Sequence, residues 1–580
     1  MYKKDKPPFH MKLNRMIQFA RGEKPVDLLL TNARIINVFS GEIHSGNIAV
    51  SDGFVVGFGS YTARKVMDIG GRFVSPGFID AHVHIESAMT CITEFVRAVL
   101  PRGTTTVVAD PHEIANVLGT EGIEYMLQSG RHQPMNIYFS LPSCVPATVM
   151  ETSGATLLAS DLAPYMSRKQ VVGLGEMMNY PGVIFGDSEV LAKILQAKMH
   201  RKPVDGHAPA LSGRDLCAYA AAGVSSDHEC TTLEEADEKL RIGMHIMIRE
   251  GTAAKNLRAL LPLVNERTFH RMMWCTDDRH PNDLLDDGHI DSIVREAIRS
   301  GLNPVMAIQM ATLNPAEFFG LSTLGAIAPG RAADLVVFSD LSEVKIEQVF
   351  QRGLLVAQDQ TILPEINKPA AVAIRPCMNV DAQELDFSVP ADSKRIRVMN
   401  LIPGQIVTGQ SIMDAAISNH RVIPDTSRDI LKIAVVDRHT GSGRIGKAFV
   451  RGFGLRRGAI ASSVAHDSHN IIVVGVNDAD MKAAVDTVIR LKGGMVAVCD
   501  NQVHARLALP IAGLMSPDTV ETVRMQLDRL ISVARDFGTT LRDPFMSLSF
   551  LALPVIPELK ITDRGLVDVS KFEIVSLFAP

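Results

Sequence analysis

The chain has 580 residues, of which 46% are hydrophobic and 21% are charged, and its formal net charge at pH 7 is −5. A chain of this length exceeds what one hydrophobic core usually holds, so we expect two to four domains. The slightly acidic balance argues against nucleic acid or an anionic membrane as the main partner.

Neither a targeting segment nor a disulfide framework is expected. The first 25 residues are basic but lack a continuous apolar core, which makes them a poor signal peptide. No run reaches the roughly 18 apolar residues that a membrane span needs, and the seven cysteines form no C-x-x-C pair. These features predict a cytoplasmic protein, and for a chain of this size we expect a homodimer or larger homo-oligomer.

In chain order, residues 1–26 are expected to form a helical, basic extension and residues 27–75 a small β unit. Ser-Gly and Asp-Gly dipeptides separate the apolar runs of this unit, as is typical of hairpin turns. Short strands with a Pro-Gly turn return at 321–370, so we expect both flanks to build one small β-sandwich. Residues 395–580 carry strand-like runs and a helix-like run at 478–493, which predict a C-terminal α/β domain.

Residues 76–320, between these flanks, alternate strand-like and helix-like segments. Helix-like segments lie, for example, at 113–129, 188–200 and 232–243. The candidate strands are 78–84, 104–110, 135–143, 171–177, 203–208, 223–229, 245–251 and 272–278. Eight strands alternating with helices predict a parallel sheet closed as a (β/α)8 barrel of the TIM type.

Titratable residues gather at the carboxyl ends of these predicted strands. In a (β/α)8 barrel the reactive residues come from those ends, which converge on one face. They are His82 and His84 on the first strand, Asp110, His112 and Glu113 after the second, Glu176 on the fourth, His207 on the fifth, His228 on the sixth, Arg249 on the seventh, and Asp277 and Asp278 on the eighth. A lone His-x-His pair often lies on a solvated strand face. Here other titratable residues recur at the ends of the remaining strands, which favours one functional site at the mouth of the barrel.

Six of these residues form a set of metal ligands. Imidazole nitrogens and carboxylate oxygens suit zinc, iron or manganese. Four histidines and two carboxylates exceed the need of one catalytic ion, and they fit two ions about 3.5–4 Å apart that share a bridging carboxylate. The expected ligands are His82, His84 and Asp277 for one ion, His207 and His228 for the other, and Glu176 as the bridge.

Several segments of the chain resemble a known family. In the barrel they are PGFIDAHVHIES, DPHEIANVLG, GLGEMMN, VDGHAP, MIREG and CTDDRHP, and in the C-terminal part they are GFGLRRGAIASSVAHDSHN and LALPVIPELKITDRGLVDV. The barrel segments are similar to the amidohydrolase superfamily. Together with the C-terminal segments, they resemble the bacterial adenine deaminase family.

This resemblance implies hydrolysis of adenine to hypoxanthine and ammonia, in purine salvage or adenine catabolism. It also implies two divalent ions, Mn²⁺ or Fe²⁺ before Zn²⁺, which together activate a hydroxide. Asp277 would accept a proton and pass it to the leaving ammonia. An acid is also needed to protonate the ring, and Glu113 is the first candidate, with Glu86 second.

Some residues have a second interpretation. His112 orients substrate or caps the helix that follows it, and Arg249 binds substrate or pairs with a carboxylate. Asp278 contacts substrate or metal, or only caps a loop. The motif VAHDSHN at 464–470 is either a loop that closes the barrel mouth or an extra metal site, and we favour the loop.

Other functions are less well supported by the sequence. The nearest alternative is another binuclear amidohydrolase that acts on a cyclic amide or N-acyl substrate, but those relatives often use a carboxylated lysine where this chain has Glu176. A scaffold without activity would lack a ligand, and none is missing. The cytidine deaminase fold is excluded because its H-x-E and P-C-x-x-C pattern is absent.

Overall fold

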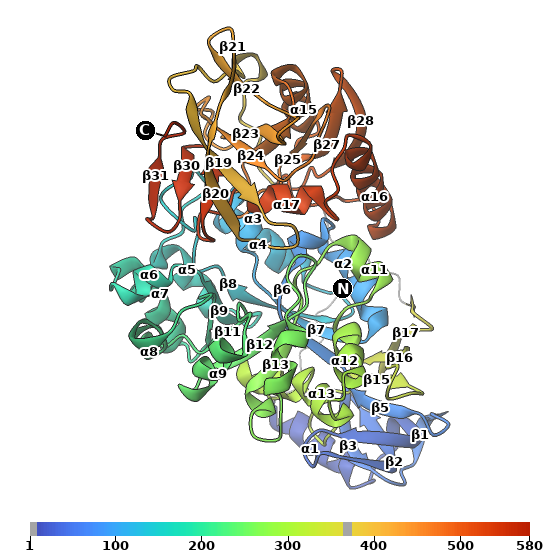
Figure 1. Ribbon diagram of the computed structural model, residues 1–580. Helices are drawn as coiled ribbons and strands as arrows, with labels where there is room; N and C mark the ends of the chain where they lie inside the picture. The colour runs from blue at the N-terminus through green and yellow to red at the C-terminus, as the bar shows by residue number, and fades with distance from the viewer. Residues whose placement is uncertain (1–8, 364–373, 580) are drawn as a thin grey trace.

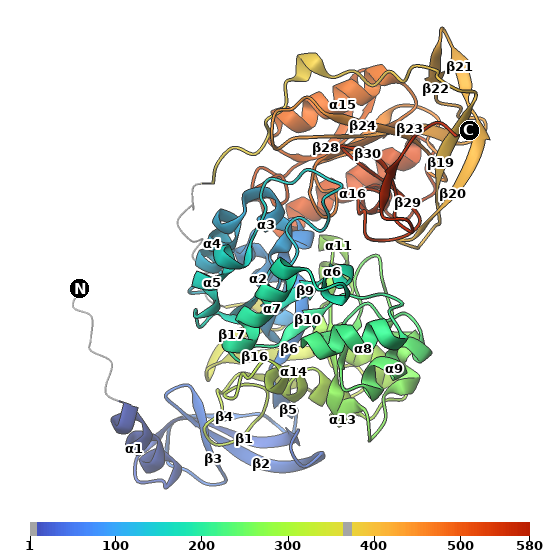
Figure 2. The same cartoon turned by 90° about the vertical axis from the view of Figure 1, so that its left-hand side faces the viewer.

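The computed structural model describes residues 9–363 and 374–579. Figure 1 shows three stacked parts: a β domain at the bottom, a barrel in the middle and a C-terminal domain above the barrel. Figure 2, turned by 90°, shows the same order, so the barrel lies between the other two parts.

The β segments on both sides of the barrel belong to one sheet. Its strands are β1 (Val26–Asn37), β2 (Glu42–Ser51), β3 (Phe54–Phe58), β4 (Ala63–Asp68), β5 (Phe73–Pro76), β15 (Leu335–Phe338), β16 (Ile346–Gln351), β17 (Leu354–Gln358) and β18 (Thr361–Ile362). β5 pairs with β15 in antiparallel register, with Ser75 opposite Val336. Leu30, Val50 and Leu335 pack in one core, so both flanks contribute to the small β domain, as the predicted fold class requires.

Helix α1 (Phe9–Ala20) packs on this β domain. Its Phe19 is buried with Val26 and Leu29 of β1 and Val56 of β3. Residues 1–8 of the predicted N-terminal extension and residues 364–370 of the predicted β domain lie outside the described residues.

The barrel is closed by parallel strands. Within the described residues these are β6 (Phe78–His84), β7 (Thr104–Ala109), β8 (Asn136–Leu141), β9 (Val171–Met177), β10 (Val204–Gly206), β11 (Ser226–Asp227), β12 (His245–Arg249), β13 (Met272–Cys275) and β14 (Asp277–Asp278). Only Thr276 separates β13 from β14, which form the two halves of the eighth barrel strand. β14 pairs with β6, and a 2.9 Å hydrogen bond from Ser225 N to Val204 O joins the β11 and β10 sides. The predicted (β/α)8 barrel is confirmed.

Helices cover the outside of the barrel (Figure 1). They are α2 (Ile92–Val99), α3 (His112–Leu118), α4 (Thr120–Ser129), α5 (Ala159–Met166), α6 (Tyr180–Ile184), α7 (Ser188–Met199), α8 (Gly213–Ala222), α9 (Leu233–Arg241), α10 (Leu257–Leu260), α11 (Pro281–Asp286), α12 (Ile290–Arg299), α13 (Pro304–Met310) and α14 (Leu313–Phe318), and short 3-10 turns are η1 (Ile85–Ala88), η2 (Leu100–Arg102), η3 (Leu261–Leu263) and η4 (Phe269–Arg271). At the start of α7 the Asp187 side chain accepts from Glu189 N at 3.0 Å and Val190 N at 2.9 Å, which satisfies two helix N–H groups.

The helical segment expected at 113–129 is two helices. α3 and α4 meet at Gly119, whose φ of 64° and ψ of −138° end the first helix and begin the second. Glycine adopts this conformation without steric cost, and a Cβ there would lie 2.9 Å from Ala155 Cβ. Because of this break, α3 and α4 need not share one helix axis. The first residues of α3 lie at the barrel mouth.

The C-terminal domain is built on an eight-stranded sheet within residues 374–579. Its elements are η5 (Ala382–Glu384), β19 (Arg395–Leu401), β20 (Thr408–Asp414), β21 (Ala416–Ser418), β22 (Arg421–Ile423), β23 (Ile430–Val436), β24 (Ile445–Arg451), β25 (Ala459–Ser462), β26 (Ile471–Gly475), α15 (Asp478–Arg490), β27 (Gly494–Cys499), β28 (Gln502–Ala508), α16 (Val520–Asp536), α17 (Pro544–Phe550), β29 (Leu559–Thr562), β30 (Gly565–Asp568) and β31 (Glu573–Val575). Along β23, Ala434 packs with Met481 of α15, while its neighbour Ile433 belongs to the core that contains Leu527 of α16. Helices therefore cover both faces of this sheet.

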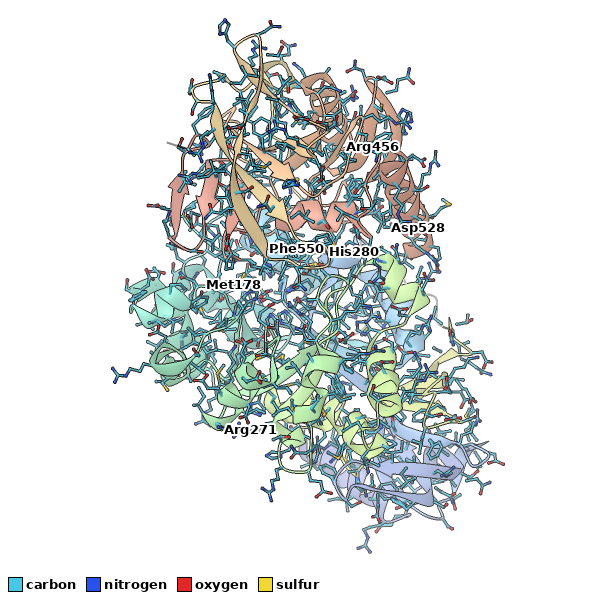
Figure 3. All side chains as sticks on the ribbon, viewed as in Figure 1. Met178, Arg271, His280, Arg456, Asp528 and Phe550 are labelled. Atoms are coloured by element: carbon cyan, nitrogen blue, oxygen red, sulfur yellow. The ribbon has the colours of Figure 1, made fainter. Side chains whose placement is uncertain are left out.

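This domain covers the mouth of the barrel. Figure 3 shows His280 and Phe550 at the boundary between the two parts, where His280 Nδ1 lies 3.0 Å from Asp543 Oδ2. Nearby, Thr152 donates to Asp563 through its N at 2.8 Å and its Oγ1 at 2.7 Å. None of the helices in the described part of the chain is long and apolar enough to cross a membrane.

Candidate metal centre and substrate cavity

His82 and His84 project from the end of β6 into the barrel mouth. Because residues two apart share a face of a strand, their Nε2 atoms lie only 3.0 Å apart. The other nitrogen of each ring has a partner: His82 Nδ1 lies 3.0 Å from Asp205 Oδ2, and His84 Nδ1 lies 2.9 Å from Asp110 O. With Nδ1 engaged, both rings present Nε2 to the centre of the cluster.

Glu176, at the end of β9, occupies the middle of the cluster. Its Oε1 lies 3.1 Å from both His84 Nε2 and His112 Nδ1. Its Oε2 lies 2.6 Å from His207 Nδ1 and 3.2 Å from His228 Nε2. Burial alone would raise the pKa of Glu176, but the surrounding histidines, His112 first, hold it well below its usual range. Each oxygen of this carboxylate therefore faces a different pair of imidazoles.

Asp110, which follows β7, supports Glu176 from behind. Its Oδ2 accepts a hydrogen bond from Glu176 N at 3.0 Å. A Cβ at Gly175 would lie 1.9 Å from that same oxygen, so the close approach of β9 to Asp110 requires glycine. Asp110 therefore holds the backbone of Glu176 in place.

Asp277 is the first residue of β14 and has a φ of 56°. This left-handed conformation costs a non-glycine residue about 1–3 kcal/mol, and it accompanies contacts on both carboxylate oxygens. Oδ1 lies 2.9 Å from His84 Nε2, and Oδ2 lies 2.5 Å from Arg249 Nη1. Burial alone would raise the pKa of Asp277, but the charge of Arg249 and its histidine neighbours hold it well below its usual range.

The donor atoms form overlapping groups whose members lie within 4.8 Å of one another. These groups include His82, His84 and Glu176, then Glu176, His207 and His228, and then His82, His228 and Asp277. Among the described residues, His228 Nε2 is buried and has no hydrogen-bond partner, although it faces Glu176. A buried polar atom without a partner costs about 1–3 kcal/mol, and a cation would satisfy it. The set therefore fits a pair of divalent ions.

Sequence reasoning missed Asp205, which lies behind this cluster on β10. Its Oδ2 lies 3.0 Å from His82 Nδ1 and 3.3 Å from His228 Nδ1. Burial alone would raise the pKa of Asp205, but His228 and His82 lower it below its usual range. A carboxylate that holds the outer nitrogen of a ligating histidine fixes the ring and its tautomer. The sequence did contain a signal for Asp205. It lies two residues before His207, and this spacing puts the two side chains on the same face of a strand.

Sequence reasoning also missed Glu229, which directly follows His228. Arg249 lies between two carboxylates: its Nη2 lies 2.9 Å from Glu229 Oε2, and its Nη1 lies 2.5 Å from Asp277 Oδ2. Of the two interpretations of Arg249, the structure shows the ion pair. The residue lines the cavity, and its guanidinium is held between Glu229 and Asp277.

A small cavity of about 40 Å³ lies above the donor cluster. The barrel contributes His84, His112, Glu113, Glu176, Met178, His207, Glu229, Arg249, Gly251, Ala253, Ala254, Asp277 and Asp278 to its wall, and the C-terminal domain contributes Ile406, His466, Asp467, Phe550, Leu553 and Ile556. One wall is thus polar and holds the donors, and the other is largely apolar. This division suits a flat heteroaromatic ring whose reacting carbon faces the polar side.

The two predicted acids lie in different surroundings. Glu86 lies outside the cavity wall and accepts from Ile114 N at 3.3 Å. Burial and the charge of Glu113 raise the pKa of Glu86 to about 7. Glu113 lines the cavity, but its oxygens lie 2.8 Å from His466 Nδ1 and 3.1 Å from His469 Nε2. Burial alone would raise the pKa of Glu113, but these two histidines hold it well below its usual range, so it is a carboxylate.

The segment 464–470 reaches the barrel mouth from the C-terminal domain. Its His466 and Asp467 line the cavity, and the His466 ring stacks on Phe550 at 4.6 Å between ring centroids. Asp467 Oδ1 lies 3.8 Å from His112 Nε2. The favoured interpretation of this segment as a closing loop agrees with its position.

Two protein families match this chain, one over the barrel and one over the C-terminal domain. Residues 73–356 match the amidohydrolase family, and residues 405–573 match the adenine deaminase C-terminal domain. The chain is 55% identical to the adenine deaminase of Desulfatibacillum aliphaticivorans over 97% of its own length and 99% of that protein. It is 50% identical to the adenine deaminase of Methanothrix thermoacetophila over 98% of its own length and 100% of that protein.

The barrel and its donor set thus define a metal-dependent amidohydrolase. The similarity to the Desulfatibacillum aliphaticivorans protein is not limited to the barrel, because identity above 50% covers nearly the whole length and so includes the C-terminal domain. The chain belongs to the adenine deaminase family. The family resemblance predicted from the sequence is confirmed.

Proposed function

We propose that this chain hydrolyses adenine to hypoxanthine and ammonia at the donor cluster around Glu176. The observation that carries the proposal is the position of this cluster at the floor of a cavity whose far wall is the adenine deaminase C-terminal domain. Relatives that carry the name adenine deaminase align with both parts of the chain.

The proposed ligands are His82, His84 and Asp277 for one divalent ion, His207 and His228 for the other, and Glu176 between them. Nitrogen and carboxylate donors without a thiolate suit Mn²⁺ or Fe²⁺, and also Zn²⁺. When bound, two such ions lower the pKa of a water molecule and provide a nucleophile for the carbon that carries the amino group.

Asp277 is the proposed base. Its Oδ1 faces the centre of the cluster, while Arg249 holds its Oδ2, so the carboxylate is fixed in one orientation. It takes a proton from the nucleophile and delivers it to the amino group, which leaves as ammonia. Arg249 is itself held by Glu229, and it therefore serves to position Asp277.

Asp278 is the proposed acid for the purine ring. Glu113 does not suit this role, because two histidines engage its carboxylate and keep it ionised. Asp278 lines the cavity, and burial together with the charge of Asp277 raises its pKa. The Ser87 hydroxyl donates to its Oδ1 at 2.5 Å, which orients the carboxyl group.

The substrate is tested by measuring hypoxanthine and ammonia after purification with Mn²⁺. Adenine, adenosine, guanine and a cyclic imide are compared, and we expect turnover of adenine. His82→Ala should abolish it, whereas the matched control His200→Ala, at an exposed position, should not. Turnover of the imide without turnover of adenine would contradict the proposed substrate and leave the metal centre intact.

We also propose a cytoplasmic location and a homo-oligomeric state. All seven cysteines are free thiols, which fits a reducing compartment. Size-exclusion chromatography with light scattering checks the second point, and a monomer would contradict it.

A further inference from the structure

Asp467, in the C-terminal wall of the cavity, differs from the other carboxylates that line it. Its side chain is 3% exposed, and within the described residues its Oδ2 is buried without a hydrogen-bond partner. Its Oδ1 lies 3.8 Å from both His112 Nε2 and His466 Nδ1, which is too long for a hydrogen bond. The other carboxylates of the wall each have a close partner, and they are Glu113, Glu176, Glu229, Asp277 and Asp278.

An unpaired carboxylate oxygen in a cavity wall indicates a ligand that donates a hydrogen bond. Burial removes the water that would hydrate the oxygen, and nothing in the protein replaces that water. The loss is recovered when the molecule that fills the cavity supplies an N–H or O–H group. A site of this kind rejects a close analogue that lacks the donor, because the oxygen then stays unpaired.

The segment that carries Asp467 is anchored on both sides of this residue. Glu113 of the barrel lies with Oε1 2.8 Å from His466 Nδ1 and with Oε2 3.1 Å from His469 Nε2. His469 Nδ1 accepts a hydrogen bond from Ala465 N at 3.2 Å, so the proton of this ring is on Nε2 and faces Glu113. This buried network of two histidines and one carboxylate fixes the position of Asp467 before a ligand binds.

The distance of Asp467 from the metal centre matches the length of a purine. The His112 ring lies between the two, with Nδ1 3.1 Å from Glu176 Oε1 and Nε2 3.8 Å from Asp467 Oδ1. Asp467 is therefore about one ring width farther from the cluster than His112 is. In adenine, the N9–H group is on the five-membered ring, away from the carbon that carries the amino group. With that carbon at the cluster, N9–H reaches the wall that holds Asp467.

We propose that Asp467 Oδ2 accepts a hydrogen bond from the N9–H group of the purine base. This inference rests on the proposed function, and it makes Asp467 a substrate-binding residue that the C-terminal domain supplies. A purine with a substituent on N9, as in a nucleoside, has no proton there and leaves Oδ2 unpaired. Asp467 therefore selects the free base over N9-substituted purines.

Binding of two unreactive ligands tests the proposal without relying on activity. Full-length protein loaded with Mn²⁺ is titrated calorimetrically with hypoxanthine and with 9-methylhypoxanthine, which lacks the N9 proton. We expect the wild type to bind hypoxanthine about 10–100-fold more tightly than the methylated base. Asp467→Ala should lose that factor for hypoxanthine and should bind 9-methylhypoxanthine no more weakly than the wild type.

The matched control is Asp518→Ala, at an exposed position of the same domain, and it should keep the wild-type preference. Equal weakening of both ligands in Asp467→Ala would overturn the proposal, because a merely structural role affects both alike. Equal affinity of the wild type for the two ligands would also overturn it. Adenine turnover by the wild type is measured separately, so that its absence contradicts the proposed function and its presence leaves these outcomes to decide the role of Asp467.

Should Asp467→Ala fail to fold, crystals of the wild type with Mn²⁺ and hypoxanthine decide. We expect N9 of the bound base within about 2.7–3.2 Å of Asp467 Oδ2. A base bound with N9 away from Asp467 would overturn the proposal.

Discussion

Asp205 acts on the metal centre from behind the ligands. Its Oδ2 lies 3.0 Å from His82 Nδ1 and 3.3 Å from His228 Nδ1, two rings assigned to different ions. Asp205→Asn keeps the shape but removes the charge, and partners of this kind contribute about 10–100-fold to metal affinity. We expect Asp205→Asn to lose Mn²⁺ to a chelator at 10–100-fold lower chelator concentration.

The matched control for this experiment is Asp215→Asn, on the exposed surface of α8. It should release Mn²⁺ at the same chelator concentration as the wild type. Retention of wild-type affinity by Asp205→Asn would contradict the positioning role.

Arg249 neutralises two buried carboxylates, Glu229 and Asp277. Arg249→Met leaves both without their cation, and removal of one member of a buried ion pair costs about 3–5 kcal/mol. We expect the free energy of unfolding of the metal-free protein to fall by about that amount. Urea denaturation measures it.

The double variant Arg249→Met with Glu229→Gln provides the internal control. It removes one of the uncompensated charges and should recover part of the lost stability. Equal stability of the single and double variants would argue against a charge effect.

At the residue scale, the strand-end rule predicted much of the site. His82, Glu176 and Asp277 lie together because parallel barrel strands bring their carboxyl ends to one face. Asp205 and Glu229 were missed, although each lies within two residues of a predicted ligand. Asp205 acts through the outer nitrogens of His82 and His228, and Glu229 acts through the guanidinium of Arg249. Spacing alone does not reveal either partner.

At the scale of elements, α17 and the segment before β20 form the apolar wall of the cavity. Phe550 stacks on His466 at 4.6 Å between centroids, and Ile406 lies in the same wall. Phe550→Ala removes a ring that excludes water and supports the substrate face. We expect KM for adenine to rise by about tenfold or more, because loss of one buried aromatic contact is worth more than about 1.4 kcal/mol.

Measuring the metal content distinguishes a loss of substrate binding in Phe550→Ala from damage to the metal centre. Phe550→Ala should bind as much Mn²⁺ as the wild type, because the ring carries no ligand. Phe572→Ala, at a position that is 49% exposed in the same domain, is the control and should leave KM unchanged. An unchanged KM in Phe550→Ala would contradict the assignment of this wall.

Element boundaries show where sequence patterns stop being informative. Strands β6 and β9 were predicted with the bounds that the structure has, because both are largely apolar runs with a titratable residue at or next to the carboxyl end. The break at Gly119 was missed because glycine within a helical pattern is often tolerated. The contact of Glu113 with His466 had no local signal, since it depends on the docking of two domains.

At the scale of the whole molecule, a buried lysine links stability to pH. Lys560 donates to Ile406 O at 2.8 Å and Phe550 O at 3.0 Å, and burial lowers its pKa to about 7. In the unfolded chain a lysine has a pKa of about 10.4. Between these two values the unfolded state binds more protons than the folded state, so the stability that depends on Lys560 rises with pH.

Lys560→Met removes this dependence. The difference in unfolding free energy between wild type and Lys560→Met should therefore shift in favour of the wild type by about 1 kcal/mol per pH unit between pH 7 and pH 9. Urea denaturation at several pH values measures it. A difference that stays constant over this range would show that Lys560 remains protonated in the folded protein.

The whole molecule divides its task between two domains. The barrel provides the donors and the base, and the C-terminal domain provides most of the apolar wall over them. The sequence predicted both domains, and the family resemblance related the second to adenine. Its contact with the active site required the structure, because the docking contacts, such as those of Thr152 with Asp563 and of His280 with Asp543, join residues far apart in the sequence.

The most direct test of the central claim is the rate of hypoxanthine formation by Glu176→Gln, compared with the wild type after both are loaded with excess Mn²⁺. Glutamine keeps the shape of the side chain but lacks the charge that faces four imidazoles. We predict that kcat falls by about 10³-fold or more, since the proposed bridge between two ions is lost. A variant that keeps kcat within tenfold of the wild type would contradict a reaction centred on Glu176.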